Sequence, residues 1–448
     1  MDDDRRLFLI LIMGYLVSRY KRLFPLGTFD APETLKTWSQ SHRLFAQNQV
    51  KDMEVREILA PGLVLSKGHI NFRRGGFSNY QCWEIDLRKR KTHVVFFNEG
   101  EFPVRAFEKT PNLRLLATLG YFYFTTNPKV DEISPPKIKV NNLFVQNGQL
   151  FQLPVVDRSA LIIFKDGRVE IPFIQAEGTL KIGQRKFKWR GVKTLKKDKS
   201  KEEPVVYNGS AGIIEPYEDP VIGPGRLAKK VLTPPKGLDL VLSLRDKKLQ
   251  VTDIRNGSTE VTRGLWILSG QKDLLKGIKK GEFLKEIAIN GLKVGDILDA
   301  VSVGPRILQD QKKRQRQLEE EGLDNDQSLC NRSHREGLKL ARAFLVKLKN
   351  GNLVSILIDG IPQADDIYPG VTPQEAADFI FEKYPQVQEV VATDPGGTMK
   401  AVYKDKNGKI QVFGNLHYLD YRYRKDGTVD FWPNGYFGRR AVTFLGVS

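Results

Sequence analysis

Residues 353–398 constrain the fold most, because they predict a strand, a helix, a second strand and a glycine loop in close succession. Apolar runs at 353–358 and 390–393 predict the two strands. Between them, TPQE at 372–375 predicts the start of a helix, with a capping box and proline at the first helical position. Two strands joined through a helix are usually parallel neighbours, so we expect both to end at the same end of a sheet.

An aspartate follows each of these predicted strands directly. Asp359 begins an Asp-Gly pair, and Asp394 precedes the Pro-Gly-Gly run at 395–397. Glycine lets the backbone approach a ligand closely. Asp-Gly and Pro-Gly are also ordinary turn sequences. The pattern therefore leaves two interpretations open, a ligand-binding end of the sheet and a pair of structural turns.

This segment resembles the C-terminal core of the phosphodiester glycosidase family. The family pattern is an arginine-bearing strand, a strand ending in Asp-Gly, a helix opening with Gly-x-Thr and Glu, a strand ending in a glycine run, and a later asparagine. The matching residues here are Arg342, Asp359, Gly360, Gly370, Thr372, Glu375, Asp394, Gly396, Gly397, Thr398 and Asn415. Weaker matches at 60–63, 82–87 and 301–305 extend the resemblance over roughly residues 55–420, with only the last third specific.

Several positions depart from the family pattern. Its Asn-Gly-Gly-Phe-Phe run corresponds here to a stretch in which Leu119 replaces the asparagine, Gly120 is kept and Tyr121 replaces the next glycine. Pro395 replaces the first glycine of the later run, and Thr398 its serine. An amide is lost and a loop is stiffened. Either change could alter the substrate or abolish activity.

The resemblance implies a glycosyl-hydrolase type of enzyme that cleaves a sugar–phosphodiester linkage on a glycan or cell-envelope polymer. It assigns catalysis to Arg342, Asp359 and Asp394. It assigns substrate or phosphate binding to Gly120, Gly396, Gly397, Thr398 and Asn415. The residue types suit this chemistry, because arginine can hold phosphate through a bidentate fork and carboxylates can exchange protons or stabilise an oxocarbenium-like centre. A structural ion pair between Arg342 and one aspartate is the alternative.

The net charge of +18, from 71 Lys+Arg against 53 Asp+Glu, favours anionic partners. Residues 181–201 contain ten Lys/Arg and one acid, and Phe187 and Trp189 alternate there with basic residues. The stretch could be a solvated strand and loop, or an anion-binding platform with stacking aromatics. Besides a hydrolase acting on anionic carbohydrate, a non-catalytic anionic-glycan-binding protein and a nucleic-acid-associated basic protein remain as alternatives. No nucleic-acid-binding motif accompanies the charge, which argues against the last.

Metal and cofactor signals are weak. Cys82 and Cys330 allow one disulfide at most and exclude zinc bound by a cysteine cluster. The five histidines have no close metal-ligand spacing. We therefore expect no metal and no cofactor.

The N-terminus carries an apolar run at 7–17, eleven residues long, which is too short for an ordinary membrane span. Arg5 and Arg6 precede it, but no small-residue cleavage site follows. A signal peptide, a short membrane anchor and a packed helix all stay open, with the location unknown and export or membrane association favoured.

Together these patterns predict an α+β fold, with a mixed β-sheet core, associated helices and an N-terminal helical segment. We expect an apolar and helical region at 1–54, a glycosidase-like domain at 55–420 and an aromatic tail at 421–448 that packs as a final strand pair. The domain divides into a first half at 55–180, a basic middle at 181–300 and a C-terminal core at 301–420. Hairpin turns are predicted at 165–168, 349–352 and 407–408, and a solvated helix at 306–322.

Overall fold

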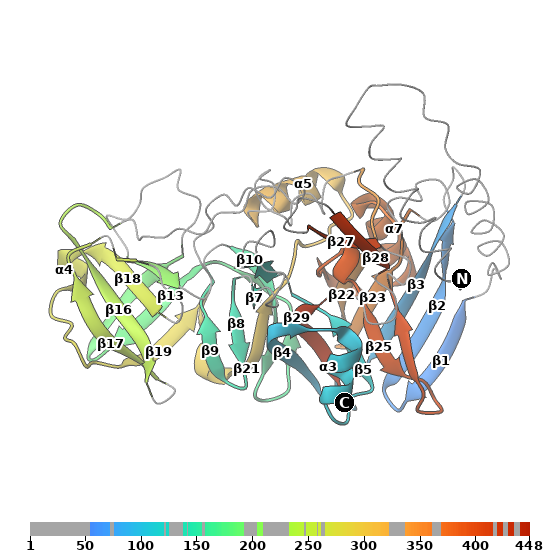
Figure 1. Cartoon of the computed structure of the whole chain (residues 1–448), viewed down its shortest axis with the longest axis horizontal. Coiled ribbons are helices and arrows are strands. Elements are labelled where there is room, and N and C mark those ends of the chain that lie inside the picture. Colours follow the sequence, from blue (N-terminus) through green and yellow to red (C-terminus); the bar gives the residue numbers. More distant parts are fainter. Residues whose placement is uncertain are drawn as a thin grey trace, which may run out of the picture.

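The described part of the protein is built mainly from antiparallel β-sheets (Figure 1). The computed structural model describes residues 54–71, 76–120, 122–124, 138–140, 142–154, 157–191, 204–208, 233–245, 248–257, 259–260, 265–321, 337–360, 369–414, 419–423, 429–433 and 440–448. These residues contain four α-helices: α3 (Pro103–Lys109), α4 (Lys272–Leu275), α5 (Gln311–Glu320) and α7 (Pro373–Lys383). Two short 3-10 turns are η1 (Val294–Asp296) and η2 (Gly396–Thr398).

The predicted α+β class is therefore wrong, because the described chain is β-rich and its few helices lie against sheets. The strong helix signal at 372–375 marks one such helix and not a layer of helices. Residues 1–53, which include the predicted N-terminal helical segment, lie outside the described residues.

Sheet 1 holds the segment that dominated the sequence. Its order is β1-β2-β3-β23-β22-β24. The strands are β1 (Val55–Ala60), β2 (Leu63–Asn71), β3 (Phe77–Ile85), β22 (Arg342–Leu348), β23 (Leu353–Ile358) and β24 (Val387–Ala392). Because β22 pairs antiparallel with both β23 and β24, those two strands are parallel, as predicted. They are not neighbours, however, because β22 lies between them.

Sheet 2 has the order β26-β25-β5-β29-β4, and its last strand in sequence lies inside it. The strands are β4 (Thr92–Glu101), β5 (Leu115–Thr118), β25 (Ala401–Lys404), β26 (Ile410–Phe413) and β29 (Ala441–Val447). The predicted final strand pair is present as β27 (Leu419–Tyr423) with β28 (Val429–Pro433), whereas β29 is an inner strand between β5 and β4. A further pair joins β6 (Phe122–Phe124) and β7 (Ile138–Val140).

Sheet 3 has the order β11-β10-β21-β8-β9, and β12 also pairs with β10. Sheet 4 has the order β17-β16-β18-β15-β14-β13-β19-β20. The strands of sheet 3 are β8 (Phe144–Gln146), β9 (Gln149–Gln152), β10 (Arg158–Phe164), β11 (Val169–Glu170), β12 (Phe173–Ile174) and β21 (Ile297–Ser302). Those of sheet 4 are β13 (Glu177–Ile182), β14 (Arg185–Arg190), β15 (Val205–Asn208), β16 (Gly237–Arg245), β17 (Lys248–Arg255), β18 (Leu265–Gln271), β19 (Leu284–Ile289) and β20 (Leu292–Lys293). Sheet 4 and α4 form a lobe at one end of the molecule, opposite sheet 1 (Figure 1).

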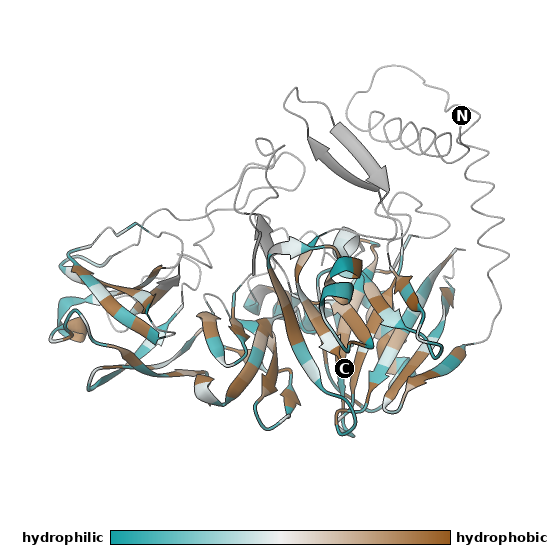
Figure 2. Ribbon diagram, turned by 60° about the horizontal axis from the view of Figure 1, so that its bottom comes forward, coloured by the Kyte–Doolittle hydropathy of each residue, from teal (hydrophilic) through white to brown (hydrophobic). Residues whose placement is uncertain are grey.

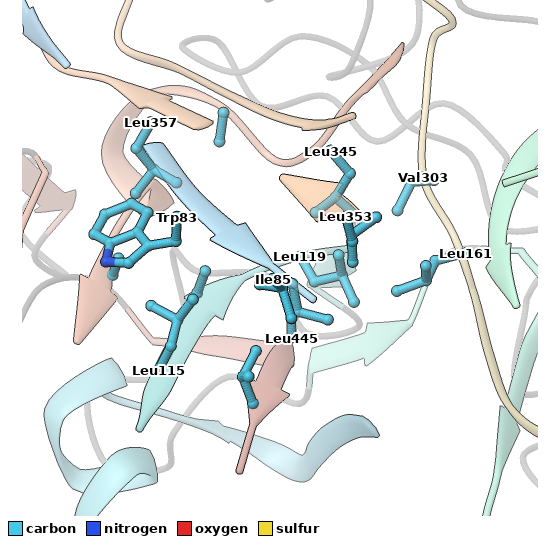
Figure 3. Close-up of a cluster of buried hydrophobic side chains, with 14 of the residues drawn as sticks. Trp83, Ile85, Leu115, Leu119, Leu161, Val303, Leu345, Leu353, Leu357 and Leu445 are labelled. Carbon is cyan, nitrogen blue, oxygen red and sulfur yellow. The ribbon is translucent and has the colours of Figure 1, made fainter. Parts of the chain in front are cut away.

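Apolar residues concentrate on the strands and polar ones at the turns (Figure 2). One central core joins sheets 1, 2 and 3 through residues such as Trp83, Leu445 and Leu161 (Figure 3). Alternate residues of β22 and β23 face this core or a second one under α7, for example Leu345 and Phe344 respectively. Both faces of these strands are therefore covered, which explains their unbroken apolar runs.

Strand β10 divides two cores in the same way. Leu161 and Ile163 belong to the central core, whereas Ala160, Ile162 and Phe164 belong to the core of the sheet 4 lobe. Because side chains alternate along a strand, one short strand contributes to both.

Local predictions fare better than the fold class. The hairpins predicted at 349–352, 407–408 and 165–168 are confirmed by the antiparallel pairs β22–β23, β25–β26 and β10–β11. The capping box is confirmed in both directions, by Thr372 and Glu375 at the start of α7. The helix predicted at 306–322 is present as α5, although Arg314 and Leu318 on it are buried, so it is only partly solvated.

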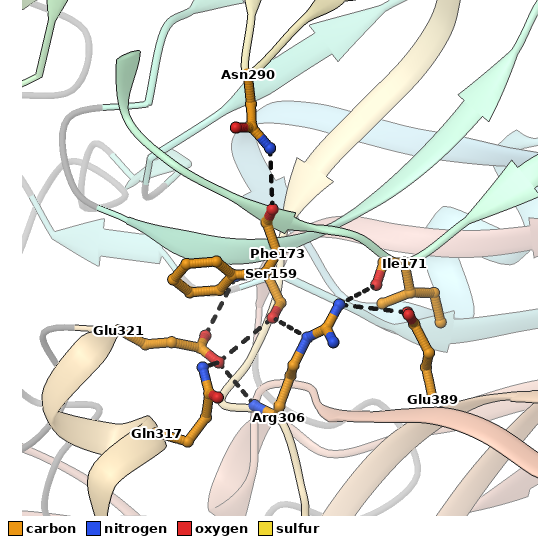
Figure 4. Close-up of polar contacts among 8 residues, drawn as sticks. All are labelled: Ser159, Ile171, Phe173, Asn290, Arg306, Gln317, Glu321 and Glu389. Atoms are coloured by element: carbon orange, nitrogen blue, oxygen red, sulfur yellow. Dashed lines mark hydrogen bonds and ion pairs between the residues drawn. The ribbon is translucent and has the colours of Figure 1, made fainter.

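The segment after β21 connects sheet 3 to sheet 1. The Val303 N–H donates to the Ser159 carbonyl, 2.9 Å away, and the Gly304 N–H donates to the Ala392 carbonyl at 2.8 Å. The buried Glu321 carboxylate accepts from the backbone N–H groups of Ser159 at 3.2 Å and Arg306 at 2.8 Å (Figure 4). Burial raises the pKa of Glu321, and these hydrogen bonds oppose the rise. The network covers the β24 side of sheet 1.

Candidate functional site

The predicted catalytic residues come from three adjacent strands of sheet 1. Asp359 directly follows β23, Arg342 is the first residue of β22, and Asp394 lies two residues beyond β24. Since β22 runs antiparallel between the other two strands, its start lies beside their ends. The backbone confirms this proximity, because the Thr393 N–H donates to the Ala343 carbonyl at 2.9 Å. We call this region, formed by the start of β22 and the ends of β23 and β24, the site end of sheet 1.

Arg342 is buried at the site end, with an exposed fraction of 2%. Its Nε donates to the Val371 carbonyl at 2.7 Å, and its Nη2 donates to the Leu338 carbonyl at 2.7 Å. Both bonds are charge-assisted and orient the guanidinium group. Arg342 therefore has a structural role in tying the segment before β22 to the start of α7.

Asp359 is nearly as buried, with an exposed fraction of 7%. Its backbone N–H donates to the Asn79 carbonyl at 2.8 Å, and its Oδ1 accepts from the Gly360 N–H at 2.8 Å. A Cβ on Gly360 would lie 2.2 Å from the Gly370 Cα, so these two glycines permit a close backbone contact. Close packing of the backbone therefore accounts for Gly360 and Gly370, which both match the family pattern.

The Asp394 loop turns back onto sheet 2. Asp394 is half-buried, and its N–H donates to the Leu119 carbonyl at 3.1 Å. Gly396 has a φ of +72°, a left-handed conformation that favours glycine. Its N–H donates to the Ala341 carbonyl at 2.9 Å, which holds the turn against the segment before β22. Phosphate binding by Gly396 stays a prediction. The Thr398 hydroxyl donates to the Pro395 carbonyl at 3.2 Å, and Gly397 is buried beside it.

The stretch aligned with the family's asparagine is part of the hydrophobic core. Leu119 has an exposed fraction of 1% and belongs to the central core, where Figure 3 shows it near Ile85 and Leu353. The Gly120 N–H donates to Thr443 Oγ1 at 3.0 Å, and a Cβ there would lie 2.7 Å from a Val301 methyl group. Gly120 is thus explained by packing. Tyr121 and Asn415 lie outside the described residues.

Lys400 is a functional candidate that the sequence interpretation missed. It directly precedes β25 and has an exposed fraction of 0%. Its N–H donates to Thr118 Oγ1 at 3.1 Å, and its carbonyl accepts from the Thr118 N–H at 3.0 Å. Burial lowers the pKa of Lys400 to about 8, and the charge of Asp359 opposes that shift. A lysine inside the apolar run 399–403 was the available signal.

The described part of the basic stretch, residues 181–191, lies on sheet 4, mainly on β14. Trp189 on β14 is buried in the lobe core, with an exposed fraction of 0%, and Phe187 packs against that core. The Trp189 ring therefore cannot stack on a ligand at the surface, and Phe187 is only partly exposed, which weakens the aromatic half of the predicted platform. Lys186 and Lys188 are exposed on the opposite face of the strand. Anion binding through their charge stays a prediction.

The described part of the chain has neither a metal-ligand cluster nor a membrane-spanning helix. There, no group of three or more His, Cys, Asp and Glu residues could hold a metal ion. Cys82 is a buried free thiol on β3, and Cys330 lies outside the described residues. Among the described helices, none has the length and hydropathy to cross a membrane. The apolar run 7–17 lies outside the described residues.

Comparisons with known proteins show similarity of fold. No protein-family profile matches the chain, and no curated protein matches it in sequence. A hypothetical protein from Synechocystis matches with a TM-score of 0.53 and 13% identity, over 89% of this chain and 64% of that one. The chain therefore spans less than two thirds of that relative. A candidate exported protein from Burkholderia pseudomallei matches with a TM-score of 0.51 and 14% identity, over 83% of this chain and 74% of that one.

A third solved structure is more distant. The zebrafish N-acetylglucosamine-1-phosphodiester alpha-N-acetylglucosaminidase catalytic domain, auto-inhibited by its pro-peptide, matches with a TM-score of 0.40 and 12% identity, over 92% of each chain. A similarity of this size does not establish a shared fold.

Proposed function

We propose that this protein hydrolyses a glycosyl phosphodiester linkage on a glycan or cell-envelope polymer. The observation that carries the proposal is the convergence of Asp359, Asp394 and Arg342 at the site end of sheet 1. Asp359 and Arg342 are also buried there. Charges in such surroundings are screened less than at the surface, which suits them to act on a reacting group.

The proposed reaction breaks the bond between the anomeric carbon of the sugar and the phosphate oxygen. Water adds to the anomeric carbon, a carboxylate accepts the proton that the water loses, and the products are a free sugar and a phosphomonoester. One aspartate serves as this base or as a nucleophile, and the other stabilises the oxocarbenium-like centre. Gly397 and Thr398 are proposed to contact the substrate, and so is Asn415, which the family resemblance alone assigns to this role.

Binding of an anionic glycan without hydrolysis is the second candidate. A specific observation favours it, because Leu119 lies in the hydrophobic core where the family resemblance expects an amide. Pro395 in the following loop is a second departure. The two candidates share the site end of sheet 1 and differ only in turnover.

A panel of sugar-1-phosphodiesters with varied sugar and alkyl groups distinguishes them. The full-length protein is incubated with each compound, and free sugar and phosphomonoester are quantified together. Hydrolysis predicts equal amounts of both products, and loss of both in Asp359→Asn. Binding by calorimetry without product formation supports the second candidate. Neither binding nor turnover with any compound contradicts both. Export stays a prediction that rests on the apolar run 7–17.

A further inference from the structure

The outer face of sheet 4 carries a row of cations that the proposed function does not use. On β14, Trp189 belongs to the lobe core and Phe187 packs against it. Because side chains alternate along a strand, Lys186, Lys188 and Arg190 lie on the opposite, outer face. Alternate residues of a strand are about 7 Å apart, so these three cations span about 13 Å in a line. We call Lys186, Lys188 and Arg190 the β14 row.

Neighbouring acids do not neutralise the β14 row. The side chains of Lys186 and Lys188 form no ion pair or hydrogen bond within the part of the chain that the structure describes. In the register of β13 with β14, Lys181 lies directly opposite Lys186, and like charges at such positions destabilise a sheet. Lys181 itself is paired with Glu286 on β19, at 3.1 Å. The row therefore keeps unbalanced positive charge, which favours an anionic partner.

The two lysines of the row also lie at an open edge of the sheet. β15 pairs with β14 at a single position, Arg190 with Val205, where the Arg190 N–H donates to the Pro204 carbonyl at 3.1 Å. The direction of the backbone N–H groups alternates along a strand, so those of Lys186 and Lys188 point to the same side. No described strand pairs with β14 on that side before residue 190. Two backbone N–H groups therefore lie beside two ammonium groups, and both kinds of donor favour an anion.

The face around the row offers charge without aromatic stacking. On β13, the residues opposite the row are Lys181, Thr179 and Glu177. The described residues of β13 and β14 therefore place no aromatic ring on this face. Proteins that hold single-stranded nucleic acid combine a basic groove with rings on which the bases stack. The missing rings favour an anionic polymer without bases.

The position of the lobe favours a long ligand. The lobe lies at the end of the molecule opposite sheet 1, which carries the candidate site (Figure 1). A single small anion cannot contact both regions, whereas a chain with a charge on each repeating unit can. We propose that the β14 row binds a linear carbohydrate polymer joined by phosphodiester groups, one linkage of which is cleaved at the site end of sheet 1. This inference rests on the proposed function and names its substrate class.

An oligomer of abasic nucleotides tests the row apart from catalysis. It is a carbohydrate phosphodiester chain without a glycosyl phosphate bond, so the proposed reaction cannot cleave it. Its affinity for the full-length protein is measured by calorimetry at several salt concentrations. In the double variant Lys186→Gln with Lys188→Gln, binding at low salt should be at least about tenfold weaker, and the slope of log K against log salt should be smaller by about 1.4.

The matched control is the double variant Lys406→Gln with Lys409→Gln, which removes the same charge from the exposed β25–β26 turn. It should change the affinity less than about twofold, because charges far from a bound ligand are screened by salt. Equal losses of affinity in the two double variants, or no binding by wild type, would overturn the inference.

A variant that strengthens binding excludes damage to the fold as the explanation. Glu177 is the acid that lies opposite Arg190 on the same face. Glu177→Gln removes this repulsion of an anionic chain and should tighten binding about two- to fivefold. Glu108→Gln, at an exposed position of α3, is the control and should leave the affinity unchanged. The same affinity in both variants contradicts binding along the row.

Comparison with ordinary single-stranded DNA of equal length identifies the kind of polymer. Equal affinity for the abasic and the ordinary oligomer supports the inference. DNA that binds more than about tenfold more tightly would assign the face to nucleic acid and overturn it, because stacked bases add that much affinity. If wild type binds the abasic chain through the row but cleaves no compound of the panel, the hydrolytic proposal alone fails. Cleavage without binding of the abasic chain refutes the polymer inference and leaves hydrolysis intact.

Discussion

Lysines occur in two opposite environments in this molecule. Lys400, which precedes β25 of sheet 2, is completely buried, whereas on sheet 4 Lys186 and Lys188 are exposed to solvent on β14. A buried charge interacts strongly with few neighbours, and exposed charges interact weakly with many, because water and salt screen them. The comparison shows that the number of basic residues in a stretch does not locate a site. The excess charge is visible in the sequence, but burial is not, and among the described residues Lys400 is the one lysine that is buried.

The largest expected effect concerns Asp359. Asp359→Asn keeps an oxygen that can accept the Gly360 N–H but removes the ionisable group. Turnover on the hydrolysed phosphodiester should fall by about 100- to 10,000-fold, as is typical when a general acid or base is lost. The measurement is kcat/KM at neutral pH. Asp405→Asn is the control, because Asp405 also follows a strand and accepts backbone N–H groups, but in an exposed turn. Equal losses in both variants would place the site elsewhere.

The second effect is a pH-dependent change in stability at Lys400. Its folded pKa, about 8, lies below the ordinary lysine value of 10.5, so the unfolded chain binds more protons between these values. Stability contributed by this group is therefore lowest below pH 8 and rises toward pH 10.5. Lys400→Met should abolish that rise and increase the free energy of unfolding at pH 7 by on the order of 3 kcal/mol. Denaturant unfolding at pH 7, 8.5 and 10 measures the free energy of unfolding of both proteins. The same pH dependence in wild type and Lys400→Met would contradict the prediction.

The third effect concerns Arg342. Lysine at this position cannot donate to the Val371 and Leu338 carbonyls in the same geometry. Arg342→Lys should lower the free energy of unfolding by about 1.5–3 kcal/mol, the usual range for a hydrogen bond to a charged group. Arg88→Lys is the control, since the Arg88 side chain is 80% exposed and should tolerate the change. An unchanged midpoint of unfolding in Arg342→Lys would show that these bonds add little.

The smallest effect on stability is expected on sheet 4. Replacing Lys186 and Lys188 with glutamine should change the free energy of unfolding by less than about 0.5 kcal/mol. The double variant should nevertheless elute from a dextran sulfate column at lower salt, because two charges leave one exposed face. Lys406→Gln with Lys409→Gln removes the same charge from the β25–β26 turn, where both lysines are exposed. Elution of the two double variants at the same salt would show that only net charge matters.

Local structure was predictable from the sequence where its cause was local. The capping box at Thr372 and Glu375 and the three hairpin turns depend on residues a few positions apart. The order of sheet 1 was not predictable in this way, because β23 pairs with β3, which lies far away in the sequence. The helix signals were real, but they belong to single helices that cover sheets, and they misled the assignment of the fold class.

The candidate site shows the same division. The sequence pointed to Arg342, Asp359 and Asp394 because each stands at the end of an apolar run. It could not indicate that two nitrogens of Arg342 serve backbone carbonyls, since that depends on the position of Leu338 and Val371 in space. Lys400 was missed because its burial results from packing against β5, a strand about 280 residues earlier.

Because β10 contributes side chains to two cores, the protein cannot simply be divided into a lobe and a remainder that each keep a complete core. The sheet 4 lobe leaves sheet 3 after β12 and returns near it, where the Asn290 amide donates to the Phe173 carbonyl at 3.2 Å. Such a connection resembles an inserted module that could be cut out and its ends rejoined. Excision would, however, uncover Ile162 and Phe164, which belong to the core of the lobe. We therefore expect the lobe and the remainder to unfold together, and we expect a shortened protein to aggregate through the apolar side chains that excision exposes.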